Sequence, residues 1–171
     1  MRQAVLALSL ALVVAGCSSK PYTVVRQAQP NPFKQHGCTL TVDPIAFDRL
    51  VVDGTPEAAY VGQKTPEEQA KYEDDKKAMS FAFKQELVAN SSASLIADAP
   101  ASGGNAFVLK PSLTSMTNSG EFELVVDITD TSGSTLDEIR VKGRSAGLRG
   151  AAGPLGQHVA RYLKTRLSCA R

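Results

Sequence analysis

The first 17 residues constrain this chain most. They form an apolar leader that ends directly before a cysteine. Arg2 gives the leader a basic start, residues 4–14 form its apolar run, and small residues precede Cys17. This is the order of a secretory signal peptide. At a rise of about 1.5 Å per residue the run is too short for a hydrocarbon core of about 30 Å, so we expect a leader that is removed.

The stretch Val14-Ala15-Gly16-Cys17 resembles the lipobox of bacterial lipoproteins. The resemblance implies that the thiol of Cys17 accepts a lipid thioether and that residues 1–16 are then cleaved off. Two or three acyl chains make such an anchor effectively permanent. By resemblance to bacterial sorting rules, Ser18 after the cysteine favours the outer membrane, with the domain facing the periplasm or the cell surface. The alternative is a plain secreted protein in which Cys17 carries no lipid.

The charge balance of the chain gives no support for a strongly charged partner. Loss of Arg2 with the leader leaves 155 residues with 18 basic and 17 acidic side chains. That length suits one domain with a true core. The near balance gives no electrostatic case for nucleic-acid binding or for a polybasic membrane patch.

Two cysteines, Cys38 and Cys169, remain once Cys17 is assigned to the lipid. In an oxidising envelope the simplest expectation for an even remainder is a disulfide, and the alternative is two separate free thiols. The bridge would close a loop with 130 residues between its ends. On the chain-entropy model it would stabilise the domain by up to about 5 kcal/mol.

The sequence divides into a leader (1–16), a lipidated cysteine with a flexible tether (17–37) and one domain (38–171). The tether is predicted from Pro21, Pro30 and Pro32 and from a shortage of apolar positions. Its twenty flexible residues would give a root-mean-square reach of about 25 Å. The domain is thereby expected to stand off the membrane.

Hydrophobic periodicity predicts an α+β fold with a mainly antiparallel or mixed sheet of four to five strands and two amphipathic helices on one face. Strands are expected over 38–43, 94–99, 107–113 (with Pro111 marking an edge or a bulge), 122–128 and 136–142, and residues 47–52 either continue the first strand or pair with it. Thr65, Pro66 and Glu68 predict the start of a helix that ends near Asn90. Its apolar stripe is expected at Tyr72, Met79, Phe83 and Leu87, widened by Phe81, Ala82 and Val88, and its charged first half is expected to project into solvent. A second helix is expected from Pro154 to Ser168 after a glycine-rich loop.

The glycines before the last helix recur every three residues, at Gly147, Gly150, Gly153 and Gly156, with Arg144 and Arg149 nearby. A glycine-rich loop at a helix N-terminus can bind an anion through backbone N–H groups. The spacing matches neither phosphate-binding motif, so a flexible connector is the favoured interpretation.

No catalytic, metal-binding or cofactor-binding set is expected. His36 and His158 lack the spacing of a zinc site, and His158 has no nucleophile motif beside it. The run Glu73-Asp74-Asp75 could form a general-acid pair, but its helical spacing with lysines favours a solvated helix face. The acidic residues around the predicted hairpin do not match a calcium loop: Asp127, Asp130, Asp137 and Glu138.

Three stretches carry a wider resemblance: the lipobox, Asp43–Gly54 leading into Glu68–Leu87, and Phe122–Gly133. Their pattern resembles a family of small envelope lipoproteins of unknown function. More distantly it is similar to the α+β domains of the N-terminal part of TolB and of lipoprotein activators of peptidoglycan synthases. The resemblance implies an envelope compartment and an envelope protein partner, and transfers no functional residue.

Three functions follow as hypotheses. The first is a non-catalytic, membrane-held interaction module that docks a partner at the edge bearing Pro111 or through the helix over 66–77. The second is a small-ligand or lipid binder with its pocket between the sheet and the helices. The third, the least favoured, is a hydrolase with an unrecognised site, because nothing polar converges in the sequence.

Overall fold

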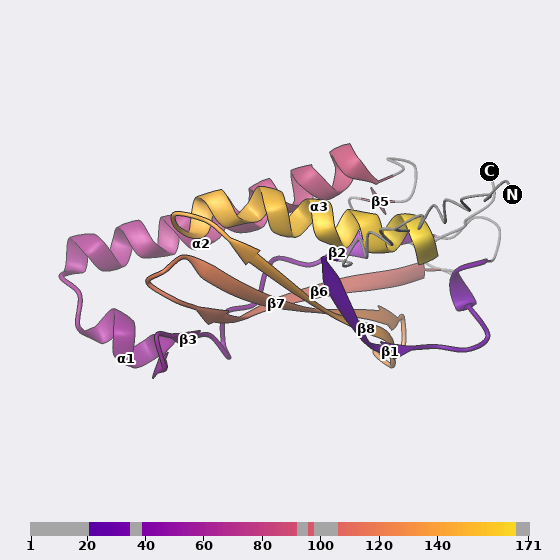
Figure 1. The fold of residues 1–171 in the computed structure, drawn as a ribbon, viewed down its shortest axis with the longest axis horizontal. Coiled ribbons are helices and arrows are strands. Elements are labelled where there is room, and N and C mark those ends of the chain that lie inside the picture. The colour runs from indigo at the N-terminus through magenta and orange to yellow at the C-terminus, as the bar shows by residue number, and fades with distance from the viewer. Residues whose placement is uncertain (1–20, 35–38, 92–95, 98–105, 167–171) are drawn as a thin grey trace, which may run out of the picture.

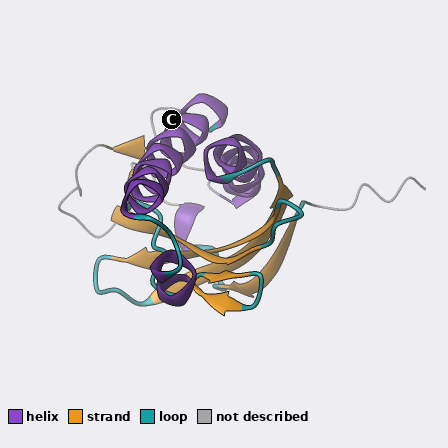
Figure 2. Cartoon of the chain, turned by 90° about the vertical axis from the view of Figure 1, so that its left-hand side faces the viewer, coloured by secondary structure: helices purple, strands orange, loops and turns teal. Residues whose placement is uncertain are grey.

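A computed structural model describes residues 21–34, 39–91, 96–97 and 106–166. It shows one mixed sheet with two long helices lying side by side on the same face (Figures 1 and 2). The strands are β1 (Tyr22–Gln27), β2 (Thr39–Val42), β3 (Val51–Val52), β4 (Thr55–Pro56), β5 (Ile96–Ala97), β6 (Ala106–Met116), β7 (Glu121–Asp130) and β8 (Thr135–Arg144). The helices are α1 (Glu57–Gly62), α2 (Pro66–Asn90), α3 (Leu148–Arg166) and the short 3₁₀ helix η1 (Pro32–Lys34).

The main path of the sheet runs β1-β8-β7-β6-β2-β5. β6, β7 and β8 form an antiparallel meander, β1 adds antiparallel to β8, and β2 runs parallel to both β6 and β5. The α+β class with two helices on one face is confirmed. The prediction of four to five strands is too low, because short β1, β3 and β4 give eight, and the short α1 is a third α-helix.

The strict alternation of β7 explains the core of the sheet. Leu124, Val126 and Ile128 point toward the helices and are almost fully buried, as are Ile139 and Val141 opposite them on β8. Side chains of the other parity lie on the face without helices. Burial on only one face therefore fixes the register that the sequence predicts.

Pro111 lies in β6, an interior strand, so the expectation of an edge there is wrong. Asp43 N–H donates to Leu109 and Ala46 N–H donates to the Pro111 carbonyl. The nitrogen of Pro111 therefore faces residues 43–46, which follow the end of β2. On the other side of β6, the pairing with β7 does not use a hydrogen bond from residue 111. The missing N–H costs no ladder bond, which is why a proline is tolerated inside the sheet.

α2 begins as predicted. The Thr65 hydroxyl accepts from Glu68 N–H and the Glu68 carboxylate accepts from Thr65 N–H, which completes a capping box before Pro66. The buried stripe of the helix consists of four predicted side chains: Tyr72, Met79, Phe83 and Leu87. The first half of α2 does not stand free, because α1 lies beside it with the rings of Tyr60 and Tyr72 5.9 Å apart.

α3 begins at Leu148, six residues before the predicted start at Pro154. The prediction of a flexible glycine-rich loop is therefore wrong from Leu148 on. Gly150, Gly153 and Gly156 are helical. A Cβ on Gly156 would lie 2.7 Å from Glu86 Cβ on α2. The two helices can approach this closely because the glycine carries no side chain, and tertiary packing outweighs its poor helix propensity.

Residues 22–34 are not a flexible tether. β1 pairs with β8 over Tyr22–Gln27, and the Phe33 ring of η1 is fully buried, 4.8 Å from the Phe107 ring. The tether prediction is therefore wrong for these residues. Burial of one aromatic ring and pairing to a neighbouring strand offset the entropy of ordering a proline-containing segment.

Candidate functional site

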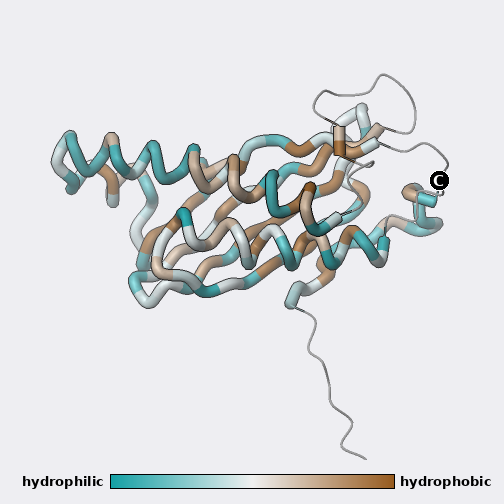
Figure 3. Tube along the Cα trace, turned by 90° about the horizontal axis from the view of Figure 1, so that it is seen from above, coloured by the Kyte–Doolittle hydropathy of each residue, from teal (hydrophilic) through white to brown (hydrophobic). Residues whose placement is uncertain are grey.

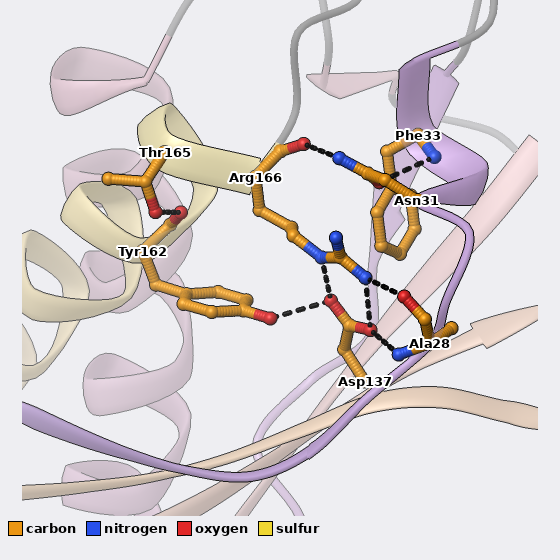
Figure 4. A network of polar contacts seen from close by, with 7 residues as sticks. All are labelled: Ala28, Asn31, Phe33, Asp137, Tyr162, Thr165 and Arg166. Atoms are coloured by element: carbon orange, nitrogen blue, oxygen red, sulfur yellow. Dashed lines mark hydrogen bonds and ion pairs between the residues drawn. The ribbon is translucent and has the colours of Figure 1, made fainter.

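The tightest polar cluster of the described chain surrounds Asp137, whose side chain points inward from β8 and is fully buried (Figure 4). Arg166 at the end of α3 donates from Nε to Oδ2 at 2.7 Å and from Nη2 to Oδ1 at 3.1 Å. The Tyr162 hydroxyl donates to Oδ2 at 2.6 Å, and Ala28 N–H donates to Oδ1 at 2.8 Å. Each carboxylate oxygen thus accepts two hydrogen bonds.

This Asp137 cluster holds three parts of the chain together. Arg166 also donates to the Ala28 carbonyl, its own carbonyl accepts from Asn31 Nδ2 at 3.0 Å, and its guanidinium lies 5.4 Å from the centre of the Phe33 ring. Burial, followed by the bond to Asp137, raises the pKa of Tyr162 well above its usual range. The bond to Asp137 also raises the pKa of Arg166, so Tyr162 and Arg166 both stay protonated. With no accessible proton to exchange, the cluster is a structural clamp on residues 28–33.

The clamp fixes β1, an outermost strand of the sheet. β1 pairs with β8 on one side, and its other side is an edge of the sheet. Val24 is 39% exposed and Val25 48% exposed, and the register shifts at Val25. Thr23 lies opposite the exposed Arg140 of β8. We call this surface the β1 edge and define it by Val24, Val25, Arg26, Arg140 and Lys142. It combines exposed valines with cationic side chains, of which Arg26 lies opposite Glu138 and Lys142 forms an ion pair with Glu123.

The helix-free face of the sheet carries a row of charges across four strands. Asp127 on β7 lies opposite Glu138 on β8, with Lys110 and Arg26 as the outer members of the row. Burial, followed by repulsion from Glu138, raises the pKa of Asp127. The described residues contain no group of three or more His, Cys, Asp or Glu that could hold a metal ion. Two carboxylates flanked by two cations form a mixed surface and not a cation site.

A second apolar surface lies on the outer side of α2, where Phe81 is 66% exposed and Val88 is 37% exposed. The sequence predicts both as part of the buried stripe, and this is wrong. α2 buries only the side that faces the sheet and α3, and Phe81 lies outside that arc. Phe81, Lys84, Gln85, Val88 and Ala89 line an open hollow of about 490 Å³.

The remaining candidate residues are the three cysteines and the two histidines. Cys17, Cys38, Cys169 and His36 lie outside the described residues. His158 lies on α3, where its Nδ1 is buried and has no hydrogen-bond partner in the described part of the chain. Burial, followed by the charge of Arg161, lowers its pKa.

The acidic motifs take the structural roles expected of them. In the run Glu73-Asp74-Asp75, each carboxylate forms an ion pair, with Lys76, Lys77 and Arg149 respectively. Asp130 accepts from the N–H groups of Ser132 and Ser134 and so shapes the turn between β7 and β8. The clamp role of Asp137 is the one that the sequence did not predict. Its parity gives the signal, because Asp137 alternates with Ile139 and Val141 on the buried face of β8.

The described helices include none that is both long and apolar enough to cross a membrane. No protein-family model matches the chain, and no curated protein matches it. Among solved structures it is similar to a PelC dodecamer from Paraburkholderia phytofirmans, with 17% identity and a TM-score of 0.49, over 88% of this chain and 99% of that one. A point variant of the PelC dodecamer from the same organism gives 14% identity and a TM-score of 0.43 over the same shares. At these values the function has to be argued from the residues of this chain.

Proposed function

We propose that this chain is a lipoprotein of the cell envelope, anchored through Cys17 to the outer membrane, whose folded domain acts there as a non-catalytic binding module. The observation that carries the proposal is the short distance in sequence between the lipobox and the fold. Cys17 precedes the first residue of β1, Tyr22, by five positions. An anchor at Cys17 would therefore hold the sheet itself at the membrane.

The arrangement of polar groups supports binding over catalysis. The best-ordered polar cluster, around Asp137, is buried and internally satisfied. The exposed features of the described chain are apolar and charged surfaces on the β1 edge and α2. Surfaces of this kind bind partners, whereas a catalytic site needs polar groups that converge in a cleft.

A ligand pocket between the sheet and the helices, the alternative function, has less support. The space between these layers is filled by side chains that are almost fully buried, among them Phe83, Leu109, Leu113, Leu155 and Val159. Interiors packed in this way leave few voids larger than a water molecule. The hollow of about 490 Å³ beside Phe81 lies on the outer side of α2 and not between these layers.

Crosslinking in intact envelopes, followed by purification of the chain and identification of crosslinked proteins, tests this function. Wild type is compared with Cys17→Ser, which removes the anchor, and with Glu121→Gln, an exposed substitution, as a control that keeps it. We expect a set of partner proteins that the control retains and the anchorless variant loses. Recovery of the same set with all three chains would contradict a function that depends on the membrane.

A further inference from the structure

The length of chain between the proposed anchor and the sheet sets how far the domain can lie from the membrane. Four residues separate Cys17 from Tyr22. At no more than about 3.6 Å per residue, the five steps from Cys17 to Tyr22 span at most about 18 Å. α2 alone has 25 residues and is about 37 Å long. The anchor therefore restricts which side of the domain lies nearest the lipid.

The side nearest Tyr22 is the β1 edge. Val24 and Val25 follow Tyr22 by two and three positions in β1 and are two of five large apolar residues exposed in the described chain. Arg26 is exposed beside them, and Arg140 lies opposite Thr23. Lys142, next but one on β8, is 79% exposed, and its ion pair with Glu123 spans 3.4 Å. The short linker from Cys17 thus ends at an edge of the sheet. There Val24, opposite Ile139, continues the helix side, and Arg26, Arg140 and Lys142 lie on the helix-free side.

The apolar surface on α2 lies on a different side of the domain from the β1 edge. α3 lies between α2 and β1, as the end-on view shows, and the view from above shows the two helices side by side along the sheet (Figures 2 and 3). The contacts agree, because Tyr22 of β1 packs on Tyr162 of α3, whereas Ser80 of α2 bonds to Ile45 beyond β2. Phe81 of α2 therefore belongs to the opposite half of the domain.

We propose that the β1 edge rests on the membrane leaflet that carries the anchor, an inference that depends on the proposed lipidation of Cys17. Val24 and Val25 contact the boundary between headgroups and acyl chains. Arg26, Arg140 and Lys142 lie at the level of the lipid phosphates. The negative charge of the phosphates attracts these cationic side chains. The anchor supplies the attachment, and the β1 edge supplies the orientation. The surface on α2 then faces away from this part of the leaflet and is free for a protein partner.

Photo-crosslinking of the full-length lipidated protein tests this orientation. The protein is reconstituted in vesicles of phosphatidylethanolamine and phosphatidylglycerol, with a benzophenone amino acid in place of Val25 or, as a control that is even more exposed, Phe81. We expect phospholipid adducts at position 25 and at least tenfold fewer at position 81. Equal labelling, labelling of position 81 alone, or crosslinks at position 25 to a second copy of the chain would overturn the proposal.

Charge reversal separates orientation from attachment. Arg140→Glu with Lys142→Glu is expected to lower the lipid adducts at position 25 several-fold while the amount of vesicle-bound protein stays unchanged. Lys71→Glu with Lys77→Glu on α2 is the matched control, with the same change in charge, and is expected to leave the adducts unchanged. An unchanged yield in the double variant would also overturn the proposal. The mass of the N-terminal peptide is measured on the same sample, so absence of lipid on Cys17 is recognised separately as failure of the proposed function.

Discussion

Arg166 and Asp137 form a side-on ion pair, in which two guanidinium nitrogens contact two carboxylate oxygens at 2.7 and 3.1 Å with both residues buried. The pair joins the end of α3 to β8. Ala28 and Asn31 bond to the same two residues or their backbone, so the pair also fixes the segment that follows β1.

Asp137→Asn is expected to lower the free energy of unfolding by about 3–5 kcal/mol, because it leaves the Arg166 charge buried without a counter-charge. Urea denaturation followed by circular dichroism measures the change. Glu121→Gln, which removes an exposed ion pair with Arg144, is the control and is expected to cost under about 1 kcal/mol. Similar losses in the two variants would contradict the clamp.

Gly156→Ala is expected to destabilise the domain by about 1–3 kcal/mol, since the new Cβ would meet Glu86 Cβ at 2.7 Å and the Phe83 carbonyl oxygen at 3.2 Å. Gly153→Ala in the same helix meets no atom within 4 Å and is expected to stabilise by about 0.5–1 kcal/mol. Thermal unfolding of the two variants checks this. Changes of the same sign would show that helix propensity, and not the contact between α2 and α3, governs this position.

His158 makes stability depend on pH. Burial and Arg161 lower its pKa in the folded chain below the ordinary value of 6.5, so the unfolded chain binds this proton more readily. Its contribution to stability is fully present above that ordinary value and is lost as the pH falls below it. The free energy of unfolding of wild type is expected to drop more steeply than that of His158→Gln between pH 7.5 and 5. Parallel curves would show that the imidazole does not titrate in this way.

The disulfide between Cys38 and Cys169 remains a prediction, and the residues that flank it support it. Thr39 begins β2, and its neighbour Leu40 pairs with Phe107. The Phe33 ring packs on Phe107 and lies against Arg166, so the start of β2 and the end of α3 lie at one end of the domain. Lipidated protein that is denatured without reductant is expected to show no reactive thiol, and to show two after reduction. Two thiols without reductant would rule out the bridge.

The parts of the fold that the sequence predicts are those with a local cause. The alternation of β7 and the capping box of α2 need only neighbours along the chain to be recognised. β1 lacks such a signal, because Val24 and Val25 break its alternation and prolines lie on both sides of it. Its pairing with β8, more than 100 residues later in the chain, supplies the order instead.

The surfaces were harder to predict than the core. Phe81 fits the helical period of a buried stripe, and only the position of α2 relative to the sheet and α3 shows that it is exposed. Likewise, the pairing of β1 with β8 brings Thr23 opposite Arg140, which the sequence separates by 117 positions. Surfaces assembled from distant segments depend on the tertiary arrangement, so the candidate interaction surfaces come from the structure, whereas the proposed anchor comes from the sequence.

The mass of the mature N-terminal peptide, isolated from the outer-membrane fraction, tests the central claim most directly. The account predicts a peptide that begins at Cys17 and carries a diacylglyceryl thioether, in a chain that has lost residues 1–16. An unmodified Cys17, or a mature N-terminus at another residue, would contradict the claim that this domain is held at the membrane by its lipid.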